Sequence, residues 1–317
     1  MGTALALSER GRGRTAPNPN VGCVIVLQGH VVGRGWTMPG GRPHAEAMAL
    51  AQAGAATRGA TVYVTLEPCA HRGGRGPACA DLLVDAAPAR VVIAARDPDP
   101  RTNGKGTQRL QDAGIVVTEG VRVGEAEQVM AGFFMRQCHG RPHVTLKLAT
   151  SLDGCIALGD GASRWITGDV ARAHAHMERA RADLIVVGRG TLDADVPRLD
   201  VRLPGLADRG PRRALLSGNA AAVPQGWLHL ARPQDVAGCT GVDHVLVEGG
   251  AGAAAAFVAA DLVDRLLIYR APVLIGGGRP ALGDIGLADL PAAHGRWRRS
   301  GGVALGVDIL DVYERIR

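Results

Sequence analysis

The stretch TVYVTLEPCAHRGGRGPACADLLVDAA, residues 61–87, shows which fold to expect for the first half of this chain. Its first residues, 61–66, are rich in β-branched and apolar side chains and predict a strand, and residues 79–87 predict a helix. Cys69 and Cys79 lie after that strand and enclose a segment of His, Arg, Gly and Pro. In a chain of 317 residues with six cysteines, such a pair could be a metal site, a disulfide or a coincidence of composition.

Strand and helix patterns alternate on both sides of this stretch. Near-continuous apolar runs predict strands at 21–27, 90–95 and 115–118, and further patterns predict helices at 44–54, 108–113 and 124–138. This alternating order predicts a sheet with helices on both of its faces.

A second domain is predicted after residue 142, because HGRP at 139–142 breaks the preceding helix. Further strands are predicted at 143–149, 184–188, 213–216, 244–247, 266–269, 273–275 and 306–317, with helices at 170–181 and 251–260. Residues 203–242 are rich in Gly, Pro and Ala and otherwise give no clear pattern. We therefore expect two α/β domains, residues 1–142 and 143–317.

Composition argues against nucleic-acid and membrane partners. The net charge is +6, but the arginines are scattered, and three Phe and three Tyr offer few rings for stacking on bases. No apolar run is long enough to cross a bilayer, and no export signal is apparent, so we expect a cytoplasmic protein. In that reducing compartment, paired cysteines bind metal more often than they form disulfides.

A zinc site is the interpretation that the neighbouring residues favour. His44, Cys69 and Cys79 supply three ligands and leave a fourth position for water, which predicts one zinc per chain. Glu46 stays off the metal and shuttles the proton, as in zinc nucleobase deaminases. We expect a helix to begin at Cys69, where its N-terminus would favour the thiolate. His71 is an alternative ligand, or else a loop or substrate contact.

The cysteine spacing differs from the usual P-C-x-x-C of that class, because nine residues separate Cys69 from Cys79. With APNPNVGCVIV (16–26), HAE (44–46), TLEPCAH (65–71) and GPAC (76–79), this segment resembles the deaminase half of the bifunctional riboflavin-biosynthesis deaminase/reductase family. Members of that family carry a Gly- and Arg-containing loop between the cysteines, usually one residue shorter. DPDP (97–100) and NGKG (103–106) match family loops less specifically.

This resemblance implies a fold and a reaction for the first domain. The fold would be a cytidine-deaminase-like three-layer α/β/α domain. The substrate would be 2,5-diamino-6-(5-phosphoribosylamino)pyrimidin-4-one, which loses its C2 amine by zinc-dependent hydrolysis while Glu46 protonates the ring and then the leaving ammonia. Asn20 is suited to bind the pyrimidine, with a turn-capping role as the alternative.

The second half resembles the reductase domain of the same family. The segments that carry this likeness are VTLKLATSLDG (144–154), SRWIT (163–167), ADLIVVGRGTLDADVPRLDVR (182–202) and LVEGGAGAAAAF (246–257). The resemblance implies a dihydrofolate-reductase-like α/β fold and NADPH as the cofactor. The glycine turn that starts at Gly250, between a strand and a helix, independently suits a pyrophosphate group.

The resemblance also assigns residues by position. It implies cofactor contacts from Thr150, Trp165, Thr191, Asp195, Ser217, Gly250, Ala251, Gly252, Ala253, Ala254, Ala255 and Ala256. It implies substrate contacts from Ser163, Arg179, Leu199, Arg202 and Glu248. Lys147 is one of only two lysines, so we place it beside the reacting ribose rather than at a solvated strand edge. Trp165 has a plain core role as its alternative, and Val196 stands where the family usually has a second Asp.

Two other functions stay open on the residues alone. The chain could be a zinc deaminase acting on free bases or tRNA, or its second half could be a non-catalytic nucleotide-binding domain. The long loop between the cysteines and the SLDG and SRWIT segments favour the bifunctional enzyme. We expect a small phosphorylated pyrimidine as substrate and a homo-oligomer, either a dimer or a tetramer.

Overall fold

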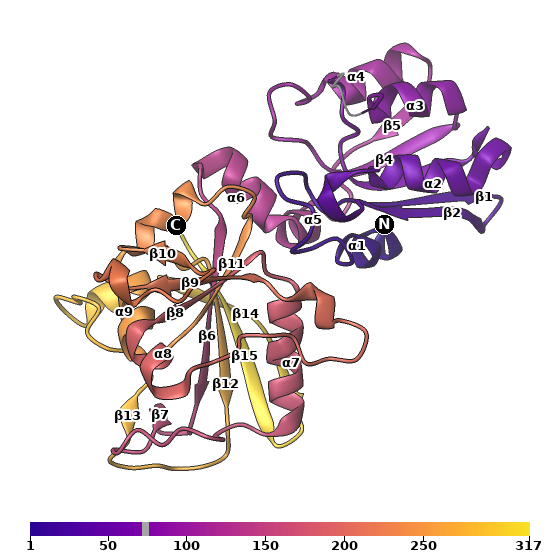
Figure 1. Cartoon of the computed structure of the whole chain (residues 1–317). Coiled ribbons are helices and arrows are strands. Elements are labelled where there is room, and N and C mark those ends of the chain that lie inside the picture. Colours follow the sequence, from indigo (N-terminus) through magenta and orange to yellow (C-terminus); the bar gives the residue numbers. More distant parts are fainter. Residues whose placement is uncertain (72–75) are drawn as a thin grey trace. The chain divides into compact units, whose positions relative to one another are not determined.

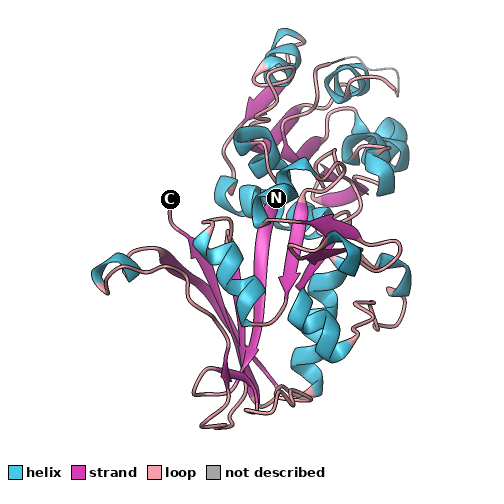
Figure 2. Cartoon of the chain, turned by 60° about the vertical axis from the view of Figure 1, so that its left-hand side comes forward, coloured by secondary structure: helices cyan, strands magenta, loops and turns pink. Residues whose placement is uncertain are grey.

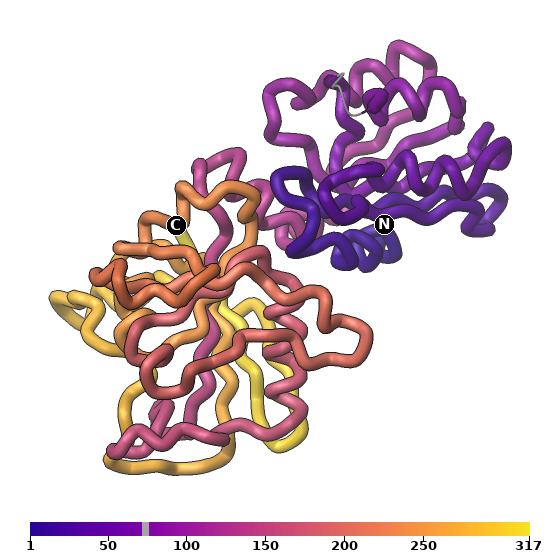
Figure 3. Tube along the Cα trace, viewed as in Figure 1, coloured from indigo at the N-terminus to yellow at the C-terminus, as the bar shows by residue number. Residues whose placement is uncertain are grey.

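The computed structural model describes residues 1–71 and 76–317, which divide into two compact units, Met1–Gly140 and Arg141–Arg317. Figure 1 shows both units, each built around its own β-sheet. The chain passes from the first unit to the second between Gly140 and Arg141. Figure 3 shows the Cα trace of both units. Among the described residues, no helix combines the length and apolar character needed to span a membrane.

The first unit contains a five-stranded sheet in the order β2-β1-β3-β4-β5. Its strands are β1 (Gly22–Leu27), β2 (His30–Trp36), β3 (Thr61–Leu66), β4 (Arg90–Ala95) and β5 (Val116–Thr118). β1 is antiparallel to β2 and β3, whereas β3, β4 and β5 are parallel. Every strand predicted for this unit is present, and β2 is an additional strand that the sequence did not predict.

Helices cover both faces of this sheet, which makes the expected three layers. They are α1 (Gly2–Ser8), α2 (Ala45–Ala53), α3 (Cys79–Ala86), α4 (Lys105–Asp112), α5 (Val123–Val129) and α6 (Ala131–His139). A Cβ on Gly22 would strike α1, and a Cβ on Gly35 would strike α2. Gly35 pairs with Cys23, the residue after Gly22, so the two glycines face opposite sides of the sheet. The single helix predicted at 124–138 is wrong, because the chain leaves helical geometry at Met130.

The second unit contains an eight-stranded sheet in the order β10-β9-β8-β11-β6-β12-β15-β14, drawn in magenta in Figure 2. Its strands are β6 (His143–Thr150), β8 (Leu184–Gly188), β9 (Arg212–Leu216), β10 (Leu228–Leu230), β11 (His244–Glu248), β12 (Arg265–Arg270), β14 (Trp297–Leu305) and β15 (Asp308–Arg315). The strands from β10 to β12 in this order are parallel. β15 pairs with β12 in antiparallel fashion, and β14 pairs with β15 in the same way. Two short strands, β7 (Cys155–Ala157) and β13 (Arg279–Pro280), pair separately.

Two strand predictions for this unit need correction. Residues 273–275 form no strand, and the predicted C-terminal strand is the second arm of the hairpin β14–β15. The helices are α7 (Asp169–Ala180), α8 (Arg189–Asp195) and α9 (Ala251–Ala259). Short 3-10 turns occur at Pro39–Gly41, Gly54–Thr57, Ala207–Arg209, Ala220–Ala222, Pro233–Gly238 and Pro291–Ala293.

The parallel strands of the second unit bring their carboxyl ends to one edge of the sheet, where ligands bind in open α/β folds. α9 approaches this edge closely, since Cβ atoms on Gly188 and Gly249 would lie only 3.0 and 3.1 Å from the Ala253 methyl. Small residues on both sides therefore set the position of the glycine turn that precedes α9.

Candidate functional sites

Three predicted ligands meet in the first unit. His44 precedes α2, Cys69 lies in the loop after β3, and Cys79 is the first residue of α3. The Nδ1 atom of His44 lies 3.3 Å from the Cys79 sulfur and 3.6 Å from the Cys69 sulfur. The potential ligand atoms of all three residues lie within 4.8 Å of one another. One imidazole nitrogen and two buried sulfurs form a donor set that suits zinc.

The helix expected at Cys69 is wrong, because residues 67–71 are not helical and Cys79 is the residue that begins a helix. Local hydrogen bonds favour the Cys69 thiolate instead. The thiol of Cys79 lowers the pKa of Cys69 by donating to its sulfur, and the same contact, together with burial, raises the pKa of Cys79. The backbone N–H of Cys79 also approaches the Cys69 sulfur, at 3.3 Å.

Glu46 lies in the first turn of α2 and is only 3% exposed. Burial raises the pKa of its carboxyl to about 7, and its side chain is hydrogen bonded to Cys79. A carboxyl with this pKa can both accept and donate a proton near neutral pH. His71 lies outside the group of three, with its Nδ1 atom 3.3 Å from the hydroxyl of Thr102.

The two asparagines of the APNPN segment differ in surroundings. Asn20 is buried, and its side-chain amide donates to the carbonyls of Ser8 and Val129, both at 3.2 Å. Asn18 was not singled out from the sequence, yet its amide nitrogen lies 3.0 Å from Nε2 of His44. In the sequence, only its position directly after Pro17 in the APNPN segment could have indicated that Asn18 belongs to the site.

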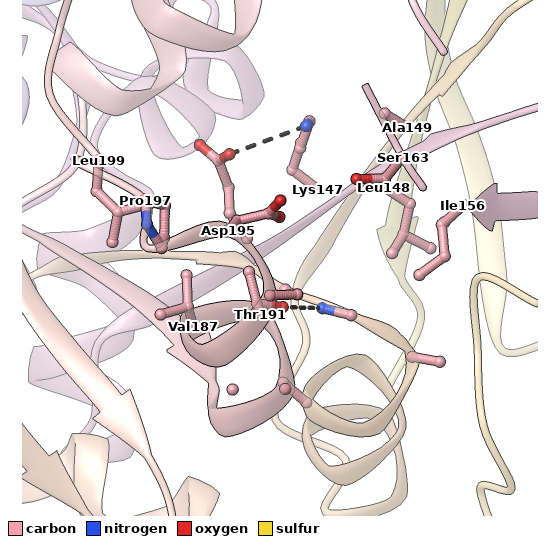
Figure 4. A pocket seen from close by; sticks show the side chains of 18 of the residues that line it. Lys147, Leu148, Ala149, Ile156, Ser163, Val187, Thr191, Asp195, Pro197 and Leu199 are labelled. Carbon is pink, nitrogen blue, oxygen red and sulfur yellow. Dashed lines mark hydrogen bonds and ion pairs between the residues drawn. The ribbon is translucent and has the colours of Figure 1, made fainter. Parts of the chain in front are cut away.

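A cavity of about 1170 Å³ opens at the carboxyl ends of the parallel strands in the second unit. Figure 4 shows Lys147, Ser163, Thr191 and Asp195 around it. Most of the predicted reductase residues line it: Lys147, Ser163, Trp165, Arg179, Thr191, Asp195, Leu199, Arg202, Ser217, Glu248, Gly250, Ala251, Gly252, Ala253 and Ala256. Thr150, Ala254 and Ala255 are buried outside its lining.

An ion-pair cluster forms one wall of this cavity. Arg179 binds Glu248 through two hydrogen bonds of 2.7 and 2.9 Å, and Lys147 Nζ lies 3.8 Å from a Glu248 oxygen. Burial alone would raise the pKa of Glu248, but the charge and hydrogen bonds of Arg179, together with the charges of Lys147 and His176, outweigh it and lower that pKa to about 2. The lysine therefore faces a carboxylate that is ionised at neutral pH.

The glycine turn lies where a pyrophosphate group could reach the start of α9. Gly250 precedes the helix in extended geometry, and its N–H donates to the Thr191 hydroxyl at 2.8 Å. This bond joins α8 to the turn. The N–H groups of the first turn of α9 have no partners within the helix, so they are suited to bind an anion at its N-terminus.

Several cavity residues were missed by sequence reasoning. The arginines Arg164, Arg172, Arg189, Arg198, Arg232 and Arg279 also line the cavity, which suits anionic ligands. His176 lies one helical turn before Arg179 on α7, and that spacing could have revealed it. Trp165 is 63% exposed, with the Arg172 guanidinium 4.8 Å from its ring centre, so the core alternative for this residue is wrong.

Solved structures share this architecture. The chain is similar to RibD from Acinetobacter baumannii, with a TM-score of 0.87 and 35% identity over 100% of this chain and 98% of that one. It is also similar, with a TM-score of 0.87 and 30% identity over 100% and 97% of the chains, to a structure from Thermotoga maritima. That structure is described as a diaminohydroxyphosphoribosylaminopyrimidine deaminase/5-amino-6-(5-phosphoribosylamino)uracil reductase.

Sequence comparisons agree with the structural ones. The cytidine and deoxycytidylate deaminase zinc-binding region matches residues 1–95, and the RibD C-terminal domain matches 142–226 and 237–309. Riboflavin biosynthesis protein RibD of Mycobacterium tuberculosis is 40% identical over 98% of this chain and 95% of that protein, and its Escherichia coli namesake is 39% identical over 87% and 88%. The chain is thus an enzyme in which a deaminase domain precedes a reductase domain. It belongs to the RibD family of riboflavin biosynthesis proteins.

Proposed function

We propose that the chain catalyses two consecutive reactions. The first is hydrolytic deamination of 2,5-diamino-6-(5-phosphoribosylamino)pyrimidin-4-one, and the second is reduction of the resulting ribosylaminouracil phosphate to its ribitylamino form. The convergence of His44, Cys69 and Cys79 beside Glu46 carries the first assignment. Deaminase residues would lie within 1–142 and reductase residues within 143–317.

In the deaminase, His44, Cys69 and Cys79 would hold one zinc ion. Zinc bound there would act as a Lewis acid that activates water for replacement of the amine. Glu46 would take one proton from that water and pass it to the ring nitrogen. It would then take the second proton from the hydroxyl added at C2 and pass it to the departing amine, which leaves as ammonia, and its raised pKa is suited to both transfers. Asn20 would offer its side-chain carbonyl oxygen to the pyrimidine, since its amide hydrogens already bind backbone carbonyls.

In the reductase, the cavity would hold NADPH and the phosphorylated substrate together. NADPH would supply the reducing equivalent at the ribose C1′ atom. The start of α9 and the turn at Gly250 would face its pyrophosphate, with Thr191 fixing the turn. Lys147 would donate a proton to the ribose ring oxygen, which becomes a hydroxyl of the ribityl chain, while Glu248 keeps the lysine charged and in place.

The residues that line the cavity also bear on the expected cofactor and substrate contacts. Its many arginines favour a substrate and a cofactor that carry phosphate, and they support NADPH over NADH. Ser163 and Arg202 line the same cavity as Lys147, which supports their assignment to the substrate. Thr150, Ala254 and Ala255 would act through the backbone, since their side chains are buried. A homo-oligomer and a cytoplasmic location stay predictions of the sequence.

Product masses test this function. The purified protein is incubated with the diaminopyrimidine substrate, first without and then with NADPH, and the products are resolved by mass spectrometry. We expect the deaminated ribosyl compound without NADPH and the compound with two additional hydrogens when NADPH is present. Turnover of free bases or tRNA in place of this substrate would instead support the base-deaminase alternative.

A further inference from the structure

Glu67 is a buried carboxylate that neither proposed reaction uses. It is 2% exposed and lies two residues before Cys69. Its two oxygens accept four backbone N–H groups: those of Gly106 and Thr107 on Oε1, at 2.9 and 3.1 Å, and those of Gly104 and Asp97 on Oε2, at 2.9 and 3.3 Å. A carboxylate so completely satisfied by one loop is built to hold that loop in place.

These bonds close the segment 97–107 at both of its ends. Asp97 begins the segment, and the other three donors lie at the start of α4, where N–H groups lack partners within the helix. Glu67 thus caps α4 from a distant part of the chain. The approach requires glycine at position 106, because a Cβ there would lie 2.1 Å from the carbonyl oxygen of Pro68.

The same segment also contacts the residues that follow Cys69. Thr102 is fully buried, and its hydroxyl lies 3.5 Å from the backbone nitrogen of Ala70 and 3.3 Å from Nδ1 of His71. The chain is therefore tied to segment 97–107 both before and after Cys69.

An ion pair also connects α4 to α3, the helix that carries Cys79. Arg109 on α4 pairs with Asp81 on α3 at 2.7 Å, and α3 begins with Cys79. Segment 97–107 and α4 together therefore connect the backbones that carry both sulfur ligands.

We propose that Glu67 is a positioning residue of the deaminase site, which fixes segment 97–107 around Cys69 and so holds the Cys69 sulfur in place for zinc. It acts through the backbone and touches neither metal nor substrate. The proposal rests on the zinc site assigned under the proposed function.

The test uses Glu67→Gln in the full-length protein. Glutamine keeps the shape of the side chain, but its NH₂ group would face two N–H donors. The matched control is Glu119→Gln, which makes the same change at another carboxylate that accepts a hydrogen bond from α4. Glu119 accepts from the Thr107 hydroxyl at 3.0 Å and pairs with Arg96 at 3.2 Å. Both contacts are made by side chains, and neither involves the backbone N–H groups that Glu67 binds.

Two measurements separate positioning from general stability. The first is the rate at which zinc passes to the chromogenic chelator pyridylazoresorcinol. We expect release roughly 10- to 100-fold faster in Glu67→Gln, as for residues that orient metal ligands, and within about twofold of wild type in Glu119→Gln. The second is the absorption spectrum of the cobalt-substituted protein, which reports thiolate geometry and should change only in Glu67→Gln.

A folded Glu67→Gln protein with wild-type zinc release and cobalt spectrum would overturn the proposal. Equal acceleration in both variants would also overturn it, because that result indicates a general loss of stability. If Glu67→Gln does not fold, Thr102→Val decides: faster zinc release supports the proposal and the wild-type rate refutes it. Wild-type protein that binds no zinc would refute the zinc site itself, a separate failure seen before any variant is made.

Discussion

Arg179 and Glu248 join α7 to the end of β11 through a bidentate ion pair, with contacts of 2.7 and 2.9 Å on the wall of the reductase cavity. The pair is almost fully buried, so its charges depend on each other more than on solvent. Lys147 completes the cluster from the neighbouring strand β6.

This pair predicts how stability changes in acid. The pKa of Glu248 is lowered to about 2 in the folded protein, whereas its ordinary value is 4.5. The stabilisation is therefore fully present above pH 4.5 and is lost as the pH falls towards 2, by on the order of 3 kcal/mol in total. The difference in Tm between wild type and Glu248→Gln, measured by thermal unfolding, should become smaller from pH 6 to pH 3.

Asp193→Asn is the control for that experiment. Asp193 pairs with Arg189 on the exposed surface of α8, so its removal should cost little at either pH. A difference in Tm between wild type and Glu248→Gln that does not depend on pH would contradict the role assigned to the ion pair.

Zinc content follows directly from the three ligands of the deaminase site. Elemental analysis should find one zinc per wild-type chain and a large loss in Cys79→Ser, because a hydroxyl is a much poorer zinc ligand than a thiolate. Cys138→Ser, at an exposed position on α6, should retain the metal. Full zinc content in Cys79→Ser would remove that cysteine from the site.

Val196 predicts a stabilising substitution. It ends α8 with φ 40° and ψ 57°, a left-handed conformation that disfavours β-branched side chains, and it is 76% exposed. Val196→Asn should raise the free energy of unfolding by about 0.5–1 kcal/mol, because asparagine tolerates this geometry. The equivalent change at exposed Val303, in the strand β14, should give no such gain.

Lys147 is predicted to serve only the reductase. Lys147→Ala should release ammonia from the diaminopyrimidine at the wild-type rate but accumulate the deaminated ribosyl compound. Loss of a proton donor should lower NADPH oxidation by roughly 10²–10⁴-fold. Unchanged NADPH oxidation in Lys147→Ala would show that Lys147 takes no part in the reduction.

The zinc ligands could be predicted from the sequence because their signals are local. His44 directly precedes α2 and Glu46 lies in its first turn, and P-C follows a clearly apolar strand. β2 was harder to predict, since Gly33 and Gly35 interrupt its apolar pattern to admit α2. The helix expected at Cys69 is wrong for a similar reason: this segment makes tertiary contacts with Thr102 and Cys79 instead of helical hydrogen bonds.

The reductase site was predicted less completely. An alanine-rich helix gives no periodicity, so the sequence could not show that Ala253 faces the cavity while Ala254 is buried. The role of Glu67 was equally hidden, because its four partners lie 30 to 40 residues further along the chain. Such long-range hydrogen bonds leave no mark in local sequence patterns.

The central claim is that one chain contains two independent catalytic sites, and Glu46→Ala tests it most directly. Glu46 is buried beside Cys79 in the first unit, and Lys147 belongs to the second. The measurement is NADPH oxidation by folded Glu46→Ala protein, with the diaminopyrimidine and with the already deaminated substrate. We predict a loss of roughly 10²–10⁴-fold or more with the first and the wild-type rate with the second. Loss of activity towards the deaminated substrate would contradict the two-site account.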